Sequence, residues 1–254
     1  MTEPSIEVLK KMVAAKPRAF FRPMSFFVAR SGVLTLVFDG FSQAILDLKR
    51  RIEETFPHLE PEHEGSKWPK VTLGVLRDDE ALARGDIVRL RDIADRWNDV
   101  LRQEGDVLDV NRLVAVEYAC RSLERRRRTV GLPLNSESDL PDPPEDHAAY
   151  VQSIVSQFSR EQMGRYSVEV EKQGHRESHY RSPARGWSLV ADVDLDRLPL
   201  ADRVMDEVER LVPDKYCRLS PESRHITIRS LNRVRTRRGR ADIDVASSRD
   251  PLAD

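Results

Sequence analysis

The chain of 254 residues contains no long, uninterrupted apolar run. Its longest mainly apolar stretch covers residues 24–38, is broken by polar and small residues at 30–32, and is shorter than the roughly 20 residues that a membrane-spanning helix needs. Residues 1–17 contain acidic side chains and neither a continuous apolar segment nor a cleavage site, so they do not resemble a secretory signal. We therefore expect a soluble protein with a cytoplasmic location and no membrane partner.

Cysteine is scarce as well, and the net charge is close to zero. Cys120 and Cys217 are the only two cysteines, and neither stands in a CxxC or other metal-like spacing, which argues against a disulfide framework and a zinc site. Lysine and arginine total 42 against 43 aspartates and glutamates, so the net charge of −1 excludes simple attraction of the whole chain to nucleic acid. We expect no metal and no cofactor, and the positions of the charges decide which partners fit.

Apolar content and a clear internal boundary are present. Hydrophobic residues make up 39% of the sequence, which suffices at this length for one large domain or two small lobes. Residues 135–147 combine three prolines with acids and serines and few apolar residues, which is typical of a linker. This composition predicts an N-terminal lobe over 1–134, a C-terminal lobe over 148–235 and a polar tail over 236–254.

Hydrophobic periodicity predicts helices and strands in both lobes. Apolar residues at helical spacing predict helices over residues 5–17, 42–56, 86–105, 151–158 and 200–211. Alternating or continuous apolar segments predict strands over residues 24–29, 33–38, 70–76, 112–120, 166–170, 187–195 and 224–231. The basic run 125–128 is typical of a hairpin turn or of a sheet edge protected by charge. The fold class expected from this pattern is α+β.

One order of elements occurs twice along the chain. A strand beginning at Val33 is followed by a helix, a polar loop and a second strand that contains Lys70. A strand beginning at Trp187 leads through the same elements to His225. The separations from strand start to these two polar residues are 37 and 38 positions. We predict two β-α-β lobes related by a pseudo-twofold axis.

Polar and apolar side chains alternate on the last strand of each unit. Because the side chains of a strand point alternately to its two faces, His225 and Thr227 are expected to share one face. Lys70 and Thr72 are related in the same way. If the polar faces meet across one cleft, the hydroxyls would hold phosphate oxygens, the lysine would supply charge and the histidine would exchange a proton near pH 7.

The segment His225-Ile226-Thr227-Ile228 resembles the motif of the 2H phosphoesterases, a family that includes RNA ligase-like and 2′,3′-cyclic phosphodiesterase proteins. Its members contain two lobes, each ending in a strand of the form His-x-Thr or His-x-Ser followed by an apolar residue. The resemblance covers residues 25–120 and 166–231 and rests on element order more than on residue identity. It implies metal-independent acid/base chemistry on RNA ends or cyclic nucleotide phosphates, carried out by two histidines in a central basic cleft.

Lys70 stands where the family motif would place its second histidine. The lysine would act as the acid only if burial and neighbouring arginines lowered its pKa, and it would otherwise clamp the phosphate. The resemblance implies His225 as the proton-transfer residue and Thr72 and Thr227 as phosphate contacts. Two alternatives stay open: a non-catalytic member that binds nucleotide or RNA, and an interaction protein with a basic C-terminal tail. A permuted lobe order relative to the family is also open.

Arginine is concentrated around the histidine motif. Eight arginines and a single acid, Glu222, lie between residues 218 and 240, which favours an anionic partner such as RNA or a nucleotide phosphate. Arg224 and Arg229 are therefore candidate substrate contacts. Tyr118, on a strand expected beside the motif strands, is a further candidate because its ring would stack on a base. The alternative is a solvated basic tail that pairs with the acidic linker.

His175 and His179 remain outside this constellation. They lie four positions apart beside Glu177, a spacing that metal ligands also show. No third ligand is in view, so a mobile polar loop is the favoured interpretation. Trp187 begins an apolar strand and is expected to pack in the core.

Overall fold

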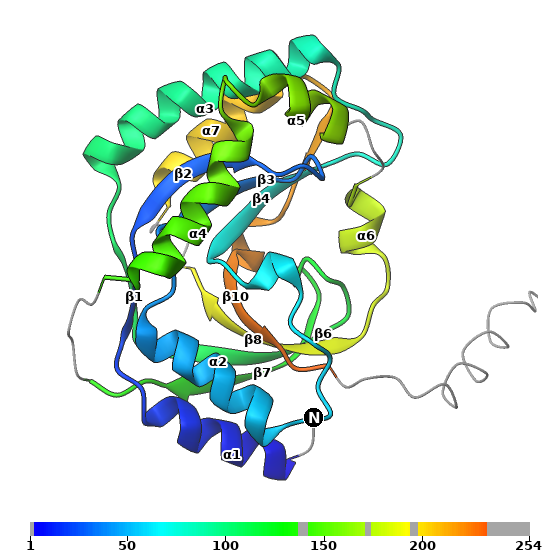
Figure 1. The fold of residues 1–254 in the computed structure, drawn as a ribbon. Helices are drawn as coiled ribbons and strands as arrows, with labels where there is room; N and C mark the ends of the chain where they lie inside the picture. The colour runs from blue at the N-terminus through cyan, green and yellow to red at the C-terminus, as the bar shows by residue number, and fades with distance from the viewer. Residues whose placement is uncertain (1–2, 137–141, 171–173, 194–197, 233–254) are drawn as a thin grey trace, which may run out of the picture.

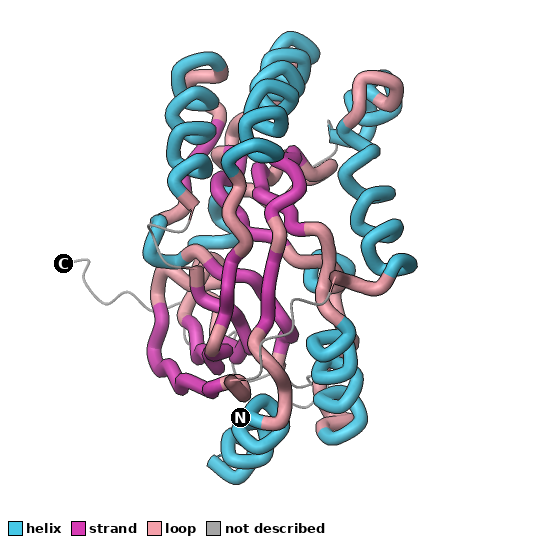
Figure 2. Tube along the Cα trace, turned by 90° about the vertical axis from the view of Figure 1, so that its left-hand side faces the viewer, coloured by secondary structure: helices cyan, strands magenta, loops and turns pink. Residues whose placement is uncertain are grey.

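The computed structural model describes residues 3–136, 142–170, 174–193 and 198–232 (Figure 1). These residues form an α+β fold in which the strands occupy the centre and the helices lie around them (Figure 2). The strands build two four-stranded sheets and one two-stranded sheet, in which every strand pair is antiparallel. No helix among the described residues is long and apolar enough to cross a membrane.

The first four-stranded sheet has the order β2-β3-β4-β9. Its strands are β2 (Pro23–Val28), β3 (Leu34–Phe38), β4 (Lys70–Leu76) and β9 (Tyr216–Arg218). Gly32, in the turn between β2 and β3, has a φ of 80°, a left-handed conformation that glycine adopts without steric cost. Two helices connect β3 to β4, namely α2 (Gln43–Thr55) and the short η1 (Glu64–Ser66).

The second four-stranded sheet has the order β10-β8-β6-β7. Its strands are β6 (Arg112–Tyr118), β7 (Arg126–Pro133), β8 (Gly186–Asp192) and β10 (His225–Ser230). Helix α7 (Pro199–Leu211) follows β8 and buries Leu200, Val204 and Val208, which share one face at a spacing of four residues. The arginine-rich start of β7 lies at the sheet edge, as predicted for residues 125–128.

The remaining elements cover and connect these sheets. Strands β1 (Ala19–Phe21) and β5 (Leu108–Val110) form the two-stranded sheet. The helix α3 (Arg84–Glu104) packs against β2 and α7, and α1 (Glu3–Ala14) packs against β7 and α2. The other helices are α4 (Glu145–Val155), η2 (Ser156–Phe158), α5 (Met163–Val170), α6 (Glu177–Arg181) and η4 (Pro221–Ser223).

Most of the predicted elements occur near their expected bounds, but two segments differ. Residues 166–170, predicted as a strand, belong to α5, where Tyr166 and Val170 lie four positions apart on one buried helical face. A short segment with apolar residues at both ends fits the strand period and the helix period equally, so periodicity does not decide between them. A short helix, α6, forms where the sequence predicts a polar loop around His179.

The two large sheets do not follow the boundary predicted at residues 135–147. β6 and β7 precede this segment yet join β8 and β10 in one sheet, whereas β9 follows it yet pairs with β4. A continuous apolar core contacts both sheets. The last residue of the segment, His147, belongs to α4 and contacts the loop after β3: its Nδ1 accepts a hydrogen bond from the Phe41 backbone N–H over 3.3 Å. The composition of residues 135–147 describes only their local polarity, and it does not determine which distant strands pair in one sheet.

Candidate functional site

A cavity of about 1100 Å³ brings the two sheets' polar residues together. Its lining includes residues of β4 from the first sheet and of β6, β8 and β10 from the second, together with loops around η1 and α6. Strands β4 and β10 belong to different sheets and contact each other. The predicted site residues that line this cavity are Lys70, Thr72, Tyr118, His225 and Thr227.

His225, the first residue of β10, has its ring oriented by the backbone. Its Nδ1 lies 2.7 Å from the carbonyl oxygen of Ser223. Because a carbonyl oxygen only accepts hydrogen bonds, Nδ1 carries the proton of the neutral ring, and Nε2 is left as the basic atom. Burial lowers the pKa of His225, and the charge of Lys70 contributes in the same direction. The imidazole is therefore uncharged at neutral pH and able to accept a proton.

The hydroxyls of Thr72 and Thr227 are available to a ligand. Both side chains are half-buried and line the cavity, and neither hydroxyl has a hydrogen-bond partner among the described residues. Strand alternation explains the placement of Thr227, because Ile226 and Ile228 on the other face of β10 are fully buried in the core. Two free hydroxyl donors on contacting strands of the two sheets suit the oxygens of a phosphate group.

Lys70 begins β4, and its ammonium group is held near a carbonyl and an aromatic ring. Nζ donates a hydrogen bond to the Gly65 carbonyl oxygen and lies 3.8 Å from the centroid of the Trp68 ring. Burial, assisted by the charge of Lys49, lowers the pKa of Lys70 to about 7. The neighbouring cation is thus a lysine, where the sequence analysis expected arginines. With this pKa the ammonium can release a proton near neutral pH.

Lys49 is fixed beside this group by three contacts. Its Nζ lies 2.6 Å from the carboxylate of Glu62, donates to the Ser66 carbonyl oxygen over 2.7 Å and stands 4.2 Å from the centroid of the Phe41 ring. The residue is only 6% exposed. These contacts attach the loop before β4 to α2, and they keep a positive charge near Lys70.

Arg224 and Arg229, the predicted substrate contacts, are turned away from the cavity. Their side chains are 2% and 1% exposed, respectively. Arg224 binds both carboxylate oxygens of Asp202 on α7, and Arg229 donates to a backbone carbonyl oxygen over 2.8 Å. A bulge in β10 shifts the register just before Arg229 and reverses the alternation, so Ser230 lines the cavity instead. Neither arginine can contact a ligand there.

The described part of the basic segment is largely neutralised. Arg218 pairs with carboxylates of α7, as Arg224 does. The arginines from residue 233 onward and the predicted tail over 236–254 lie outside the described residues. Among the residues that are described, the lysine and arginine side chains lining the cavity are Lys70, Arg121 and Arg185, and Arg185 is already paired with a carboxylate of β6. The basic residues at the cavity are therefore the predicted Lys70 together with Arg121 and Arg185, in place of the predicted Arg224 and Arg229.

Tyr118 lines the cavity at the end of β6, and its hydroxyl is engaged. Asn232 donates from Nδ2 to the Tyr118 hydroxyl oxygen over 3.0 Å and accepts the backbone N–H of Trp187 over 2.8 Å. A Cβ at Gly186 would come within 2.4 Å of both Asn232 Oδ1 and the Tyr118 hydroxyl oxygen. The ring is therefore fixed by β8 and by the chain after β10. Trp187 packs against the core, as predicted.

The cavity is also lined by His175 and His179, which the sequence predicted to lie in a mobile polar loop outside the site. His175 and His179 stack face to face, with ring centroids 3.8 Å apart and planes inclined by 2°. Tyr180 and Arg121 line the same cavity. Burial lowers the pKa of both histidines, that of His179 to about 4, and the charge of Arg121 contributes to both shifts. The four-residue spacing beside Glu177 was the available signal, but His175 lies before α6 and only His179 lies within it, so helical periodicity does not account for the stack.

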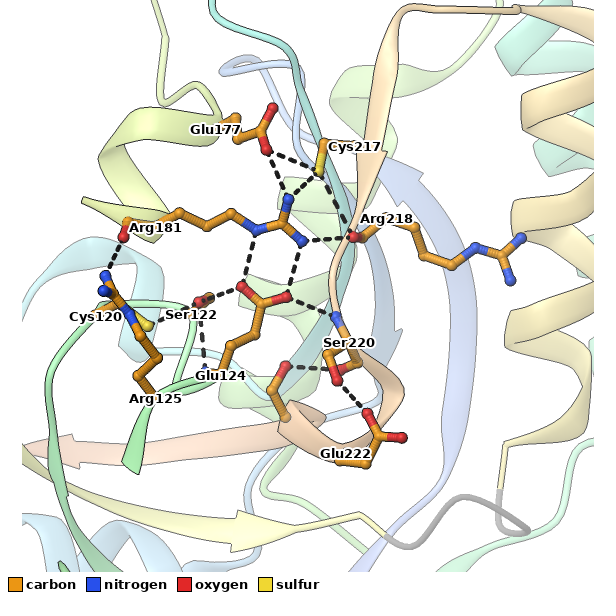
Figure 3. A network of polar contacts seen from close by, with 11 residues as sticks. Cys120, Ser122, Glu124, Arg125, Glu177, Arg181, Cys217, Arg218, Ser220 and Glu222 are labelled. Atoms are coloured by element: carbon orange, nitrogen blue, oxygen red, sulfur yellow. Dashed lines mark hydrogen bonds and ion pairs between the residues drawn. The ribbon is translucent and has the colours of Figure 1, made fainter. Parts of the chain in front are cut away.

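A network of polar contacts joins α6 to the rest of this wall (Figure 3). Arg181 donates from Nε and Nη2 to the two carboxylate oxygens of Glu124, each over 2.9 Å, and also contacts Glu177 at 2.6 Å. Glu124 accepts further hydrogen bonds from the Ser220 backbone N–H and the Ser122 hydroxyl, each over 2.9 Å. The hydrogen bonds from Arg181, Ser220 and Ser122 lower the pKa of Glu124 to about 2. The network attaches α6 to the loop between β6 and β7.

The described residues contain no group of three or more histidine, cysteine, aspartate or glutamate side chains that could hold a metal ion. Within these ranges the stacked His175 and His179 lack the third ligand that a zinc site needs. A scan against protein-family models, a search of curated proteins and a search of solved structures found no match to this chain. Function is therefore inferred from the chemistry of the cavity residues.

Proposed function

We propose that the protein is a 2H-like phosphoesterase that acts on RNA ends or cyclic nucleotide phosphates by metal-independent acid/base chemistry. The observation that carries this proposal is that the polar faces of β4 and β10 meet in one cavity, with Lys70, Thr72, His225 and Thr227. Each strand closes a segment that opens with a strand and a helix, namely β3-α2-η1-β4 and β8-α7-β9-η4-β10, and the additional strand β9 of the second segment pairs with β4. In this proposal the segments are the cores of two lobes related by a pseudo-twofold axis.

The proposed reaction is the hydrolysis of a 2′,3′-cyclic phosphate by water. Nε2 of His225 accepts a proton from the water as its oxygen bonds to phosphorus, because Nδ1 is committed to the Ser223 carbonyl. The bond from phosphorus to one ribose oxygen breaks, and the Lys70 ammonium donates a proton to that oxygen. One water is consumed and a ribose phosphate monoester is released, after which His225 returns its proton to solvent and Lys70 regains one.

Charge and hydrogen bonding at the phosphate support this assignment of roles. A lysine with its ordinary pKa of 10.5 would be a poor acid at neutral pH, whereas Lys70 has a pKa of about 7. The hydroxyls of Thr72 and Thr227 would donate to the non-bridging oxygens, whose negative charge strengthens such hydrogen bonds. Lys70, with a pKa of about 7, and His225, with a pKa lowered by burial, thus face one cavity as the candidate acid and the candidate base.

Non-catalytic binding of nucleotide or RNA is the second candidate, and one observation favours it. The Lys70 ammonium is engaged with the Gly65 carbonyl oxygen and the Trp68 ring, and it must leave these contacts to protonate a leaving group. If it stays, the lysine attracts a phosphate without completing the acid/base pair. The two candidates therefore differ in turnover and agree in binding.

The deciding experiment measures hydrolysis of 2′,3′-cyclic nucleotides and of RNA with a cyclic-phosphate end. The full chain is compared with His225→Gln and with a control, His58→Gln, because His58 is exposed and does not line the cavity. Circular dichroism confirms that each variant is folded. We expect His225→Gln to lower kcat/KM by at least roughly 100-fold, the contribution typical of a general base, and His58→Gln to leave it unchanged.

Each remaining outcome separates the candidates. Turnover that survives His225→Gln contradicts the proposed acid/base roles. Salt-sensitive binding of these substrates without turnover by the unaltered protein supports the non-catalytic candidate. Absence of both hydrolysis and binding contradicts both candidates and leaves an interaction protein.

A further inference from the structure

The cavity has a second wall that the proposed reaction does not use. It is formed by residues 174–185, which include α6, and by the loop between β6 and β7. In Figure 1, α6 stands at the right, apart from the helices that cover the sheets. The side chains that this wall presents to the cavity include Arg121, His175, His179 and Tyr180.

The aromatic rings and the guanidinium of this wall are packed together. The Tyr180 ring lies edge-on to both stacked imidazoles, with centroid distances of 6.1 Å to His175 and 5.1 Å to His179. Arg121 is exposed, and its Nη1 donates to the backbone carbonyl oxygen of His179 over 3.3 Å. Two imidazoles and one guanidinium thus gather nitrogen donors on one side of the cavity.

The wall is held in place by contacts to both large sheets. On one side, Arg181 binds Glu124 in the loop between β6 and β7 (Figure 3). On the other side, Arg176 donates to the carbonyl oxygens of Glu80 and Ser31, over 3.1 Å and 3.3 Å, beside β4 and β3. A wall held by these contacts loses little conformational freedom when it binds a ligand.

The carboxylates on these segments are directed to other partners. Glu177, next to the stack in sequence, contacts Arg181 at 2.6 Å and the Cys217 thiol at 3.2 Å. Burial and the positive charge of Arg121 lower the pKa of His175, and no carboxylate counters that shift. An anion beside the stack would supply the missing negative charge.

We propose that this wall binds a second phosphate group, so that the substrate carries one phosphate in addition to the group that reacts. The inference rests on the proposed function, because that function assigns the reacting phosphate to the side of Lys70 and His225. Arg121 presents the planar pair of N–H donors that matches phosphate oxygens, and the imidazoles of His175 and His179 add further donors. The second phosphate would be a neighbouring diester of an RNA chain or an additional monoester of a mononucleotide.

Calorimetric binding of three product-like probes tests this site. The probes are adenosine 3′-monophosphate, adenosine 3′,5′-bisphosphate and a diadenosine with a 3′-terminal phosphate. We expect at least one of the two probes with a second phosphate to bind about tenfold more tightly than the monophosphate. Preference for the bisphosphate alone would identify a mononucleotide source, and preference for the dinucleotide would identify an RNA chain. Arg121→Gln should abolish the preference, whereas the control Arg51→Gln, on the exposed face of α2, should retain it.

Proton uptake gives a second readout. A phosphate beside the stack favours imidazolium, so binding of the dinucleotide near pH 6 should take up more protons than binding of the monophosphate, because its additional phosphate is a diester that does not itself titrate there. The uptake appears as a dependence of the binding enthalpy on the buffer. Tyr180 faces the stack and stays neutral, because burial raises its pKa to about 12. His179→Gln should reduce the extra uptake.

Equal affinity of the unaltered protein for all three probes would overturn the proposal, as would a preference that survives Arg121→Gln. These measurements use binding alone. A protein that prefers two phosphates but hydrolyses nothing would contradict the proposed catalysis and retain the second-phosphate site. A protein that hydrolyses cyclic phosphates but ignores the second phosphate would do the reverse.

Discussion

Replacement of Glu124 by glutamine removes the charge at the centre of the network in Figure 3 while keeping the size of the side chain. The carboxylate accepts four hydrogen bonds, two of them from the guanidinium of Arg181. Glutamine retains one acceptor oxygen and turns an amide N–H₂ group toward the donors of the other. Each carboxylate oxygen accepts two of these bonds, so one N–H of Arg181 and either the Ser220 N–H or the Ser122 hydroxyl lose their acceptor, at a site where Glu124 is only 15% exposed.

The magnitude follows from the pKa of Glu124. Its shift from the ordinary 4.5 to about 2 corresponds to roughly 3 kcal/mol. Because the Arg181 side chain is 36% exposed, solvent screens part of the interaction, and we expect a loss of about 2 kcal/mol in the free energy of unfolding at pH 7. The pKa is lower in the folded state, so this stability is fully present above pH 4.5 and is lost as the pH falls toward 2.

Urea denaturation of the unaltered protein and of Glu124→Gln at pH 7, 5, 4 and 3 measures this difference. The gap between the two proteins should fall to less than half of its pH 7 value by pH 3, because the carboxylate then binds a proton more readily in the unfolded chain. Glu54→Gln, at an exposed position of α2, is the matched control and should show no such convergence. A gap that stays constant from pH 7 to pH 3 would refute the assigned charge network.

Three further outcomes are expected. The pH profile of kcat/KM should be bell-shaped. Its acidic limb should lie below the ordinary histidine pKa of 6.5 and come from His225, and its basic limb should lie at about 7 and come from Lys70. Lys70→Arg should remove the basic limb. Arg224→Met, which leaves Asp202 only the longer ion pair with Arg218 at 3.7 Å, should lower the free energy of unfolding in urea by about 2 kcal/mol without changing KM. Gly186→Ala should lower the melting temperature through a loss of about 1 to 3 kcal/mol, since its Cβ would meet a fixed side chain at 2.4 Å.

Local periodicity was sufficient to place several of the cavity residues. Alternation along β10 puts His225 and Thr227 on the face opposite two buried isoleucines, and the same rule applies to Lys70 and Thr72 on β4. These inferences depend only on neighbours within one strand. The structure brings all four residues to one cavity, although their chemical roles remain predictions.

Features that depend on distant residues could not be predicted in this way. β9 pairs with β4, and β6 pairs with β8, although residues 135–147 separate the members of each pair in the sequence. The composition of a segment does not encode which strand it pairs with. Arg229 points away from the cavity because a bulge in β10 reverses the alternation. Arg224 is buried in an ion pair with Asp202, which lies in α7. Whether a charged side chain can be buried depends on a partner from another element, and the sequence next to that side chain does not show this partner.

The environment of Lys70 also connects the two halves of the proposed chemistry. Burial disfavours the charged ammonium form of Lys70, and burial also lowers the pKa of His225. Both groups therefore lose their protons as the pH rises past about 7. A phosphate that enters brings negative charge, which favours the protonated form of Lys70, while His225, whose pKa lies below its ordinary 6.5, remains the group that gives up its proton first. Substrate binding would therefore restore the proton on Lys70 that the leaving oxygen requires. In the proposed mechanism Lys70 serves as the acid because burial, rather than residue type, sets the pH range in which it gives up a proton.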